Sequence, residues 1–374
     1  MGHIVKSLQI RFGDFNDDWE QCKLEEVTDE FQSGKFIAAA DIEETGEYPV
    51  YGGNGLRGYC NTYNHDGDFA LIGRQGALCG NMNFSCGKAY FTEHAVAVKA
   101  NTSSNTRFLY YLLDKMNLGQ YSDQSAQPGL AVGKLIKLEN MFPSKAEQDM
   151  IGEFFLSLDN LITLHQRKVG KFVLMKQSML QKMFPKEGEK TPEFRFEGFS
   201  DDWEQRKLED VVEFLDTLRK PLEGAKRVSG PYPYYGASGI VDYVDGYIFD
   251  EELILLSEDG ANITDRNYPV CFLASGKYWV NNHAHVLKCK DGNENNFICN
   301  SLERKDYKQY NSGMAMPKLN QEVCRGIPVS CPNYAEQKKI GDYFRNLDNL
   351  ITLHQRKVEK LKNIKRALLE KMFV

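Results

Sequence analysis

The sequence contains two copies of one pattern, and this internal repeat constrains the fold more than any other feature. The segment LDNLITLHQRKV at 158–169 returns unchanged at 347–358, an offset of 189 residues. The segment DDWEQCKLEEV at 17–27 returns as DDWEQRKLEDV at 201–211, an offset of 184 residues. Two long copies indicate a tandem duplication rather than a solenoid of short units. The difference between the offsets predicts an insertion in the second copy, between the two blocks.

Composition fits an ordinary protein of two or three domains, since 374 residues can bury several cores. The opening MGHIVKSLQIRFGDF does not read as a signal peptide, and no stretch approaches a membrane span, so we expect a cytoplasmic protein. Nine cysteines occur without a Cys-x-x-Cys pair. The spacings of Cys79/Cys86 and Cys324/Cys331 are poor for zinc. We therefore predict reduced, mostly buried thiols and no metal.

Charge is unevenly distributed along the chain. The net charge is −6, yet seven basic and two acidic residues lie between Arg356 and Lys371. The segment from His165 to Pro185 has five basic residues and no acidic one. A basic segment permits a nucleic-acid partner, although a basic helical face is more often simply solvated.

Each copy begins with a mixed region of short apolar segments that Gly, Asn and Pro interrupt. EYPVYGGNG, DFALIGRQG and AYFTEHAVAVK read as strands with turns between them. Apolar residues at helical spacing predict a helix over 106–116, with a counterpart around 295–305. The predicted fold class of this region is an α/β (α+β) globular domain.

Each copy ends in a long helix. Ser144 with Glu147, and Asn333 with Glu336, have the spacing of a capping box at the helix start. Pro185 ends the first helix, which predicts a rod from 145 to 184 of roughly 60 Å at 1.5 Å per residue. The resulting division is a first globular domain at 1–143, a central helix at 144–184, a linker at 185–197, a second globular domain at 198–332 and a C-terminal helix at 333–374.

The apolar stripe along both helices has the heptad spacing of a coiled coil. Two such helices in one chain predict an antiparallel pair, with the duplication as an approximate two-fold axis. His165 and His354 lack acidic or thiol neighbours at i±3 or i±4, so we assign them a structural role. The predicted core positions are Ile162, His165, Val169, Phe172, Met179, Met183, Ile351, His354, Val358, Leu361, Leu368 and Met372, with Lys176 and Lys365 in the same stripe.

Motifs for chemistry are absent or misleading. Gly53-x-Gly55-x-x-Gly58 matches the dinucleotide fingerprint, but the continuation YCNTYNHDGD is not helical and the second copy loses the pattern. A shared turn explains these glycines better. The sequence contains no Walker-type phosphate loop, no His-Glu-x-x-His and no Asn-Pro-Pro-aromatic tetrapeptide. This pattern favours a binding or scaffolding role over catalysis.

The two globular regions share a set of framework residues, and their sequences differ at the positions between these shared residues. Gly76-Ala77 matches Gly260-Ala261, and His94 matches His283. In contrast, Arg74-Gln75 becomes Glu258-Asp259, and Arg57 becomes Val241. A fixed framework with divergent loops is how a scaffold presents two specificities.

The chain resembles the DNA specificity subunit of type I restriction-modification systems. The resemblance is carried by PEFRFEGFSDDWEQRKL at 192–208, AEQKKIGDYF at 335–344 and LDNLITLHQRKVEKLK at 347–362, and it extends over nearly the whole chain. It implies two target recognition domains held by an antiparallel coiled coil. Each domain would read one half of a split, asymmetric site on double-stranded DNA.

The resemblance also implies partners. Two methyltransferase subunits that bind S-adenosylmethionine and modify adenine would dock on this chain. Restriction subunits that use ATP and Mg²⁺ would complete a nuclease. The chain itself would bind no cofactor and catalyse no reaction.

Loop residues with polar or charged side chains are the candidate DNA contacts, because such groups pair with base edges and phosphates. In the first domain they are Arg57, Arg74, Gln75, Asn81, Asn83 and Lys88. In the second domain they are Glu258, Asp259, Asn262, Arg266, Asn267, Lys277 and Tyr278. The competing interpretation for each residue is an ordinary solvated loop.

Two other functions remain open from the sequence. The chain could be a scaffold or regulatory relative that assembles methyltransferase or nuclease subunits without base-specific contacts. It could also be an enzyme whose site lies in the variable loops, which turnover by the isolated chain would reveal.

Overall fold

The computed structural model describes residues 10–13, 15–123 and 128–373. The first nine residues and Val374, which belong to the predicted terminal segments, lie outside the described residues. The chain forms two compact units, Met1–Gln166 with Arg356–Val374, and Arg167–Gln355. Each unit therefore contains one globular region, part of its own long helix and part of the helix from the other copy.

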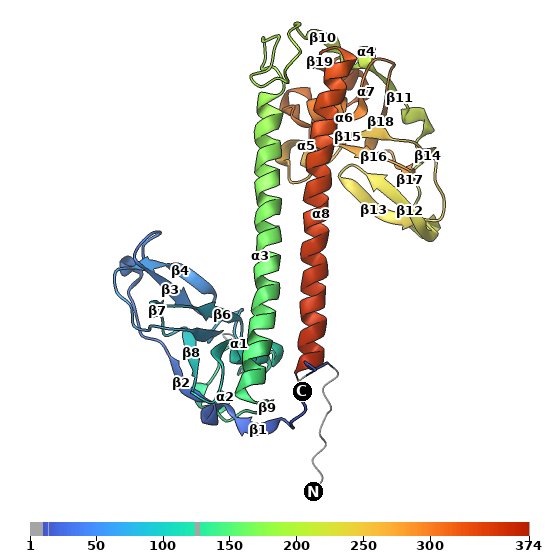
Figure 1. The fold of residues 1–374 in the computed structure, drawn as a ribbon. Coiled ribbons are helices and arrows are strands. Elements are labelled where there is room, and N and C mark those ends of the chain that lie inside the picture. The colour runs from blue at the N-terminus through green and yellow to red at the C-terminus, as the bar shows by residue number, and fades with distance from the viewer. Residues whose placement is uncertain (1–9, 14, 124–127, 374) are drawn as a thin grey trace. The chain divides into compact units, whose positions relative to one another are not determined.

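The globular region of the first unit is built on three small sheets (Figure 1). A two-stranded antiparallel sheet pairs β1 (Glu20–Lys23) with β9 (Glu139–Phe142). The largest sheet has the order β2-β8-β5-β6, with β2 at Thr28–Ser33, β8 at Ala95–Ala100, β5 at Phe69–Gly73 and β6 at Met82–Ser85. The third has the order β4-β3-β7, with β4 at Gly55–Cys60, β3 at Tyr48–Gly52 and β7 at Tyr90–Phe91.

Helix α1 (Thr106–Lys115) packs its apolar face on the main sheet, as its spacing predicts. Asn105 is its N-cap and accepts a hydrogen bond from the backbone N–H of Phe108. A short helix α2 (Val132–Leu135) precedes β9. Because the sheets are largely antiparallel and the helices are segregated from them, the mixed α+β class predicted for this region is confirmed.

The second unit repeats this plan with different lengths. Its small sheet pairs β10 (Glu204–Lys207) with β19 (Pro328–Cys331). The main sheet has the order β11-β18-β15-β16, at Val212–Phe214, Ala284–Cys289, Leu253–Ser257 and Cys271–Ala274. The third sheet has the order β13-β12-β17-β14, at Gly239–Val244, Ser229–Gly236, Lys277–Val280 and Phe249–Asp250. The helices are α4 (Leu208–Val211), α5 (Asn262–Asp265), α6 (Asn295–Glu303) and α7 (Gln321–Arg325).

The glycine motif is a hairpin turn, as the sequence predicts. Strands β3 and β4 pair antiparallel up to Gly52 and Gly55, and β12 and β13 close in the same way at Gly236 and Gly239. Gly55 has a φ of 98°, in the left-handed region that favours glycine. No helix follows β4, so the fingerprint of a dinucleotide site is not built.

Helices α3 (Lys145–Lys182) and α8 (Tyr334–Met372) begin where the caps predict. Ser144 Oγ accepts from the N–H of Glu147 at 3.4 Å, and Asn333 Oδ1 accepts from Glu336 at 3.1 Å. The prediction of the reciprocal hydrogen bond in each capping box is wrong, because neither glutamate side chain accepts from the backbone N–H of its cap residue.

Both glutamates instead bind an arginine from the segment before the globular region. Glu147 accepts two hydrogen bonds from Arg11, each 2.8 Å long, and Glu336 accepts two from Arg195, each 2.7 Å long. Both carboxylates are buried. A buried carboxylate needs such a bidentate partner, so these arginines fasten the start of each copy to its helix.

The predicted heptad stripe is the less exposed face of both helices. All twelve predicted core residues are buried or half-buried. The two lysines in the stripe are compensated by aspartates on the facing helix. Lys365 Nζ lies 2.7 Å from Asp159 in the first unit, and Lys176 Nζ lies 2.6 Å from Asp348 in the second. The four residues are equivalent at the 189-residue offset, so one ion pair is made twice.

The direction of the contacts shows that the helices run antiparallel within each unit. In the second unit Phe172 stacks on His354 at 5.8 Å, and Lys176 meets Asp348, so residue numbers rise on one helix and fall on the other. His354 is buried against this ring, which supports its structural assignment. The five-part domain division stays a prediction, because the compact units combine parts of both copies.

The end of each helix is buried in the globular core of the other copy. In the second unit Phe184 lies 5.2 Å from the ring of Phe297 and 6.1 Å from Phe344. In the first unit the equivalent Phe373 lies 5.3 Å from Phe108 and 5.9 Å from Phe155. Met183 and Met372, predicted as coiled-coil positions, are likewise part of these two cores.

Substitution of Phe373 by Ala should therefore destabilise the first unit, although the residue lies in the second copy. Removal of a buried phenylalanine ring costs about 3–5 kcal/mol. Urea unfolding followed by the fluorescence of Trp19, whose ring packs 6.5 Å from Phe373, measures the loss. Phe36→Ala is the matched control because Phe36 is 73% exposed in the same unit. Equal unfolding midpoints for the two variants would contradict the buried role.

Candidate nucleic-acid interface

Two equivalent loops follow the central strands of the main sheets, β5 and β15. Residues 74–77 form the first loop and residues 258–261 form the second. The same three backbone hydrogen bonds hold both loops. The first loop residue donates its N–H to a histidine carbonyl and accepts at its own carbonyl from a leucine N–H. The third loop residue, a glycine, donates its N–H to a proline carbonyl. They are Arg74 N to His94 O, Leu130 N to Arg74 O and Gly76 N to Pro128 O in one unit, and Glu258 N to His283 O, Leu319 N to Glu258 O and Gly260 N to Pro317 O in the other.

The glycine at the third position of each loop explains why the backbone is shared. Gly76 has a φ of 86° and Gly260 a φ of 113°, which a residue with a Cβ adopts only with strain. A fixed backbone with different side chains is the arrangement predicted from the sequence.

The first position of the loop differs in kind between the units. Arg74 is half-buried, with its Nη1 3.2 Å from Ser33 Oγ. Glu258 is held inward, because Arg219 Nη1 lies 2.6 Å from Oε2 and Lys318 Nζ lies 3.4 Å from Oε1. Glu258 as a direct DNA contact stays a prediction, and its carboxylate is already paired within the protein.

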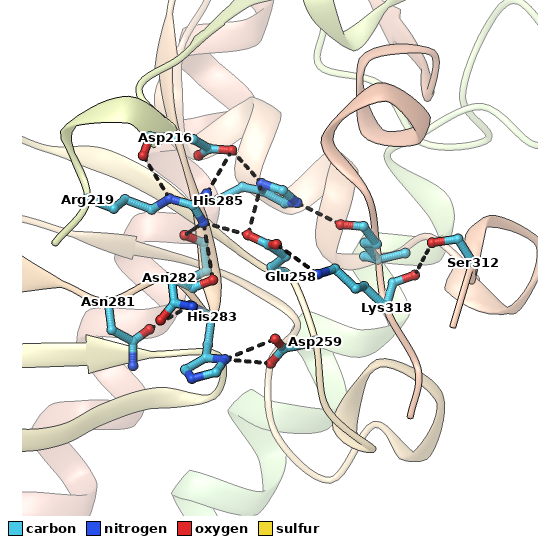
Figure 2. A network of polar contacts seen from close by, with 12 residues as sticks. Asp216, Arg219, Glu258, Asp259, Asn281, Asn282, His283, His285, Ser312 and Lys318 are labelled. Carbon is cyan, nitrogen blue, oxygen red and sulfur yellow. Dashed lines mark hydrogen bonds and ion pairs between the residues drawn. The ribbon is translucent and has the colours of Figure 1, made fainter. Parts of the chain in front are cut away.

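Glu258 belongs to a charge network centred on His285 (Figure 2). Nδ1 of His285 lies 2.6 Å from Asp216 Oδ2, and Nε2 lies 2.8 Å from the carbonyl oxygen of Leu319. Both ring nitrogens face acceptors, so both carry a proton and the ring is an imidazolium. Burial alone would lower the pKa of His285, but hydrogen bonds with Asp216 and Cys324 raise it to about 10.

The same network also changes the pKa of Asp216. Burial would raise the pKa of Asp216, but hydrogen bonds from His285 and the N–H of Val286, with the charge of Arg219, lower it overall. Asp216, Glu258 and His285 are close enough together to suggest a cation site. Arg219 and Lys318 occupy the space around their oxygens, and His285 uses both nitrogens, so the side chains do not fit a metal.

Among the other candidates of the first unit, Gln75 and Asn83 lie close to the β3–β4 turn, whereas Lys88 Nζ lies 4.6 Å from the ring centre of Tyr63. A Cβ on Gly53 would lie 2.9 Å from the His94 carbonyl, and one on Gly55 would lie 2.9 Å from Asn83 Oδ1. These glycines let the turn approach the loop at 74–77. Arg57, Gln75, Asn81 and Lys88 are exposed, whereas Asn83 is half-buried and its Nδ2 has no hydrogen-bond partner among the described residues.

Three further candidates of the second unit use their side chains within the protein. Tyr278 is fully buried in the core of the β12–β17 sheet, so its ring is not available to DNA. Asn262 uses its amide to hold the backbone of Tyr268, and Arg266 pairs with Glu303 at 3.0 Å. Asn267 and Lys277 are exposed, and Lys277 lies 4.8 Å from the ring centre of Tyr247.

Sequence reasoning missed the partners that orient these loops. His94 and His283 were visible as a shared framework position, but nothing in their spacing gave their contacts.

All nine cysteines are free, as predicted, and five of them are buried. In the described part of the chain, no helix combines the length and apolar character that a membrane span requires.

The chain matches the family described as the type I restriction modification DNA specificity domain, at residues 16–170 and again at 200–363. It belongs to this family and carries the domain twice.

Two curated relatives are specificity subunits. The chain is 46% identical over 134 residues to the type I restriction enzyme EcoprrI specificity subunit of Escherichia coli, which is 35% of this chain and 33% of that protein. It is 35% identical over 144 residues to the putative type I restriction enzyme specificity subunit S.HindORF215P of Haemophilus influenzae, 38% of this chain and 36% of that protein. The aligned segments thus span about a third of each relative.

A solved structure has the same fold over nearly its whole length. The S subunit of a type I restriction-modification system from M. genitalium superposes with a TM-score of 0.78, covering 98% of this chain and 99% of that one at 16% identity. The predicted organisation of two α/β domains in tandem, each followed by a long helix, is that of a known specificity subunit.

The charge on His285 makes the stability of the second unit depend on pH. Its pKa is raised by folding, so its contribution to stability is complete below the unfolded value of about 6.5 and is lost as the pH rises toward 10. Between pH 6 and 9 the free energy of unfolding should fall by about 3 kcal/mol more in the wild type than in His285→Gln. Urea unfolding of both proteins at each pH measures this difference. Parallel pH profiles for the two proteins would show that His285 is not an imidazolium.

Proposed function

We propose that this chain is the non-catalytic DNA reader of a type I restriction-modification complex. Each globular region reads one half of a split, asymmetric site on double-stranded DNA. The observation that carries the proposal is the pair of loops at 74–77 and 258–261, which share a backbone frame and differ in side-chain chemistry. One frame with two sets of side chains suits two different half-sites.

The paired helices would set the distance between the half-sites. Helix α3 has 38 residues, which corresponds to about 57 Å at 1.5 Å per residue. That length matches roughly 17 base pairs of duplex at 3.4 Å each. The repeated pair of Lys176 with Asp348 and Lys365 with Asp159 would fix the register of one helix on the other, and so fix the spacing.

The direct contacts would come from polar side chains of the two loops and of other segments of each globular region. Arginine and amide side chains pair with base edges, whereas lysine binds phosphates. We assign base contacts to Arg57, Arg74, Gln75, Asn81, Asp259 and Asn267, and phosphate contacts to Lys88 and Lys277. Asn83, Asn262 and Arg266 would support the loops from behind.

Catalysis would belong to partner subunits. Two adenine methyltransferase subunits would bring S-adenosylmethionine, and restriction subunits would bring ATP and Mg²⁺. A partner present in two copies needs two like surfaces, and the chain offers them. Leu161 and Leu164 are exposed on α3, and the equivalent Leu350 and Leu353 are exposed on α8. We propose each leucine pair as part of one docking site for a methyltransferase subunit.

Adenine methylation mapping tests the reading function. DNA from cells that produce this chain with its cognate methyltransferase subunit should carry a split, asymmetric methylated motif. Arg74→Ala should reduce methylation of that motif or relax one position in one half-site, since a bidentate arginine contributes about 1–3 kcal/mol of discrimination. Arg206→Ala is the control, because Arg206 lies on β10, in the small sheet with β19, and belongs to neither loop. A stable complex that leaves no methylated motif would favour a scaffold without base-specific contacts.

Charge substitution on the repeated leucines tests the docking surface. Leu161→Asp should leave one methyltransferase subunit bound instead of two, and adding Leu350→Asp should remove the second, because a buried charge lowers affinity by at least ~10-fold. Native mass spectrometry of the purified complex counts the subunits. Leu174→Asp is the matched control, since Leu174 is 67% exposed but is replaced by Asn363 in the other copy. Retention of both subunits by the double variant would place the docking site elsewhere.

A further inference from the structure

The second side chain of each loop is held by a histidine at the same framework position. Gln75 Oε1 lies 3.1 Å from Nδ1 of His94 in the first unit. Both carboxylate oxygens of Asp259 lie 2.9 Å from Nδ1 of His283 in the second (Figure 2). The loop residue changes from an amide to a carboxylate between the copies, yet its imidazole partner is kept.

Each histidine is itself anchored to a buried side chain. The backbone N–H of His94 donates to Thr92 Oγ1 at 3.3 Å, and the backbone N–H of His283 donates to Asn281 Oδ1 at 2.8 Å. Thr92 and Asn281 are 0% and 6% exposed. The same backbone segments accept the loop, because His94 O and His283 O bind the N–H of Arg74 and Glu258. The histidine is thereby fixed to the sheet and to the loop at once.

These pairs lie partly in solvent, and Nε2 of His94 also lies 3.4 Å from Oε1 of Glu93. The side chains of His94 and His283 are 44% and 50% exposed, and that of Asp259 is 25% exposed. Glu258, one residue earlier, is enclosed by Arg219 and Lys318. Two adjacent acidic residues therefore have different surroundings. Glu258 holds the loop from inside, and Asp259 is presented on the outside by an imidazole.

We propose that His94 and His283 are positioning residues that orient Gln75 and Asp259 for base recognition, an inference that rests on the proposed DNA-reading function. The imidazole Nδ1–H donates to one oxygen lone pair of each residue. Gln75 keeps its amide hydrogens and a second lone pair, which suits the N7 and N6 edge of adenine. Asp259 keeps only acceptors, which suit the amino group of cytosine or adenine and repel the O6 and N7 of guanine.

Orientation before binding explains why a partner is retained at this position. A long polar side chain loses rotamer freedom when it pairs with a base, and this loss opposes binding. A histidine held by a buried anchor removes part of that loss before DNA arrives. The imidazole also fixes the orientation of each polar group, because the single amide oxygen of Gln75 faces His94 and both carboxylate oxygens of Asp259 face His283.

The test uses the full chain with its cognate methyltransferase subunit and reads the methylated motif from cellular DNA. Asp259→Asn adds a donor, so one position of one half-site should begin to accept guanine, with discrimination lowered roughly 5- to 150-fold. His283→Ala should relax that same position by a smaller factor, and His283→Gln, which keeps a donor toward Asp259, should restore much of it. Gln75→Glu and His94→Ala should act together on one position of the other half-site.

Glu322→Gln is the control, because this side chain is 87% exposed on α7. A folding defect would lower methylation at every site without changing the motif, whereas loss of orientation changes the bases accepted at one position. An unchanged motif in Asp259→Asn overturns the inference while the wild-type motif still supports the reading function. A motif altered by Asp259→Asn but not by His283→Ala shows that the histidine does not position the reader. Absence of a motif in the wild type removes the proposed function itself.

Discussion

The burial of each helix end in the globular core of the other copy is the contact on which this structure depends. Phe184 completes the core of the second unit, and Phe373 completes that of the first. Neither globular region has its full core without residues from the other copy. A cut between the copies in sequence would therefore not separate two folding units, and deletion of a helix would remove part of a domain.

This exchange explains why the repeats keep an identical segment along the helices, at 158–169 and 347–358, and differ in the loops. Asp159, Lys176, Asp348 and Lys365 form one ion pair twice, so a change in one copy must suit the partner from the other. The bidentate pairs of Arg11 with Glu147 and Arg195 with Glu336 add the same constraint at the start of each helix. The loops at 74–77 and 258–261 carry no such reciprocal contact. Their side chains can differ while their backbone frame stays the same.

The sequence predicted the parts of the fold that depend on periodicity and on local caps. The start of both long helices, the heptad stripe, the hairpin at Gly52–Gly55 and helix α1 follow from spacing alone. The glutamates of the capping boxes were assigned to the wrong partner, because Arg11 and Arg195 are far away in sequence. Tyr278 was nominated as a surface residue, although alternation along β17 leaves Lys277 exposed and Tyr278 buried. That period-two pattern was the signal available for it.

The loop residues show where sequence reasoning stops. Glu258 and Asp259 look alike as letters, and both are acids in a divergent loop. Their roles separate only when His285, Arg219 and Lys318 on one side and His283 on the other are placed around them. The imidazolium of His285 helps to keep the pKa of Asp216 low behind the loop. A side chain that reads DNA needs a fixed neighbour and an open face, and in this chain Asp259 has both, whereas Glu258 has only the first.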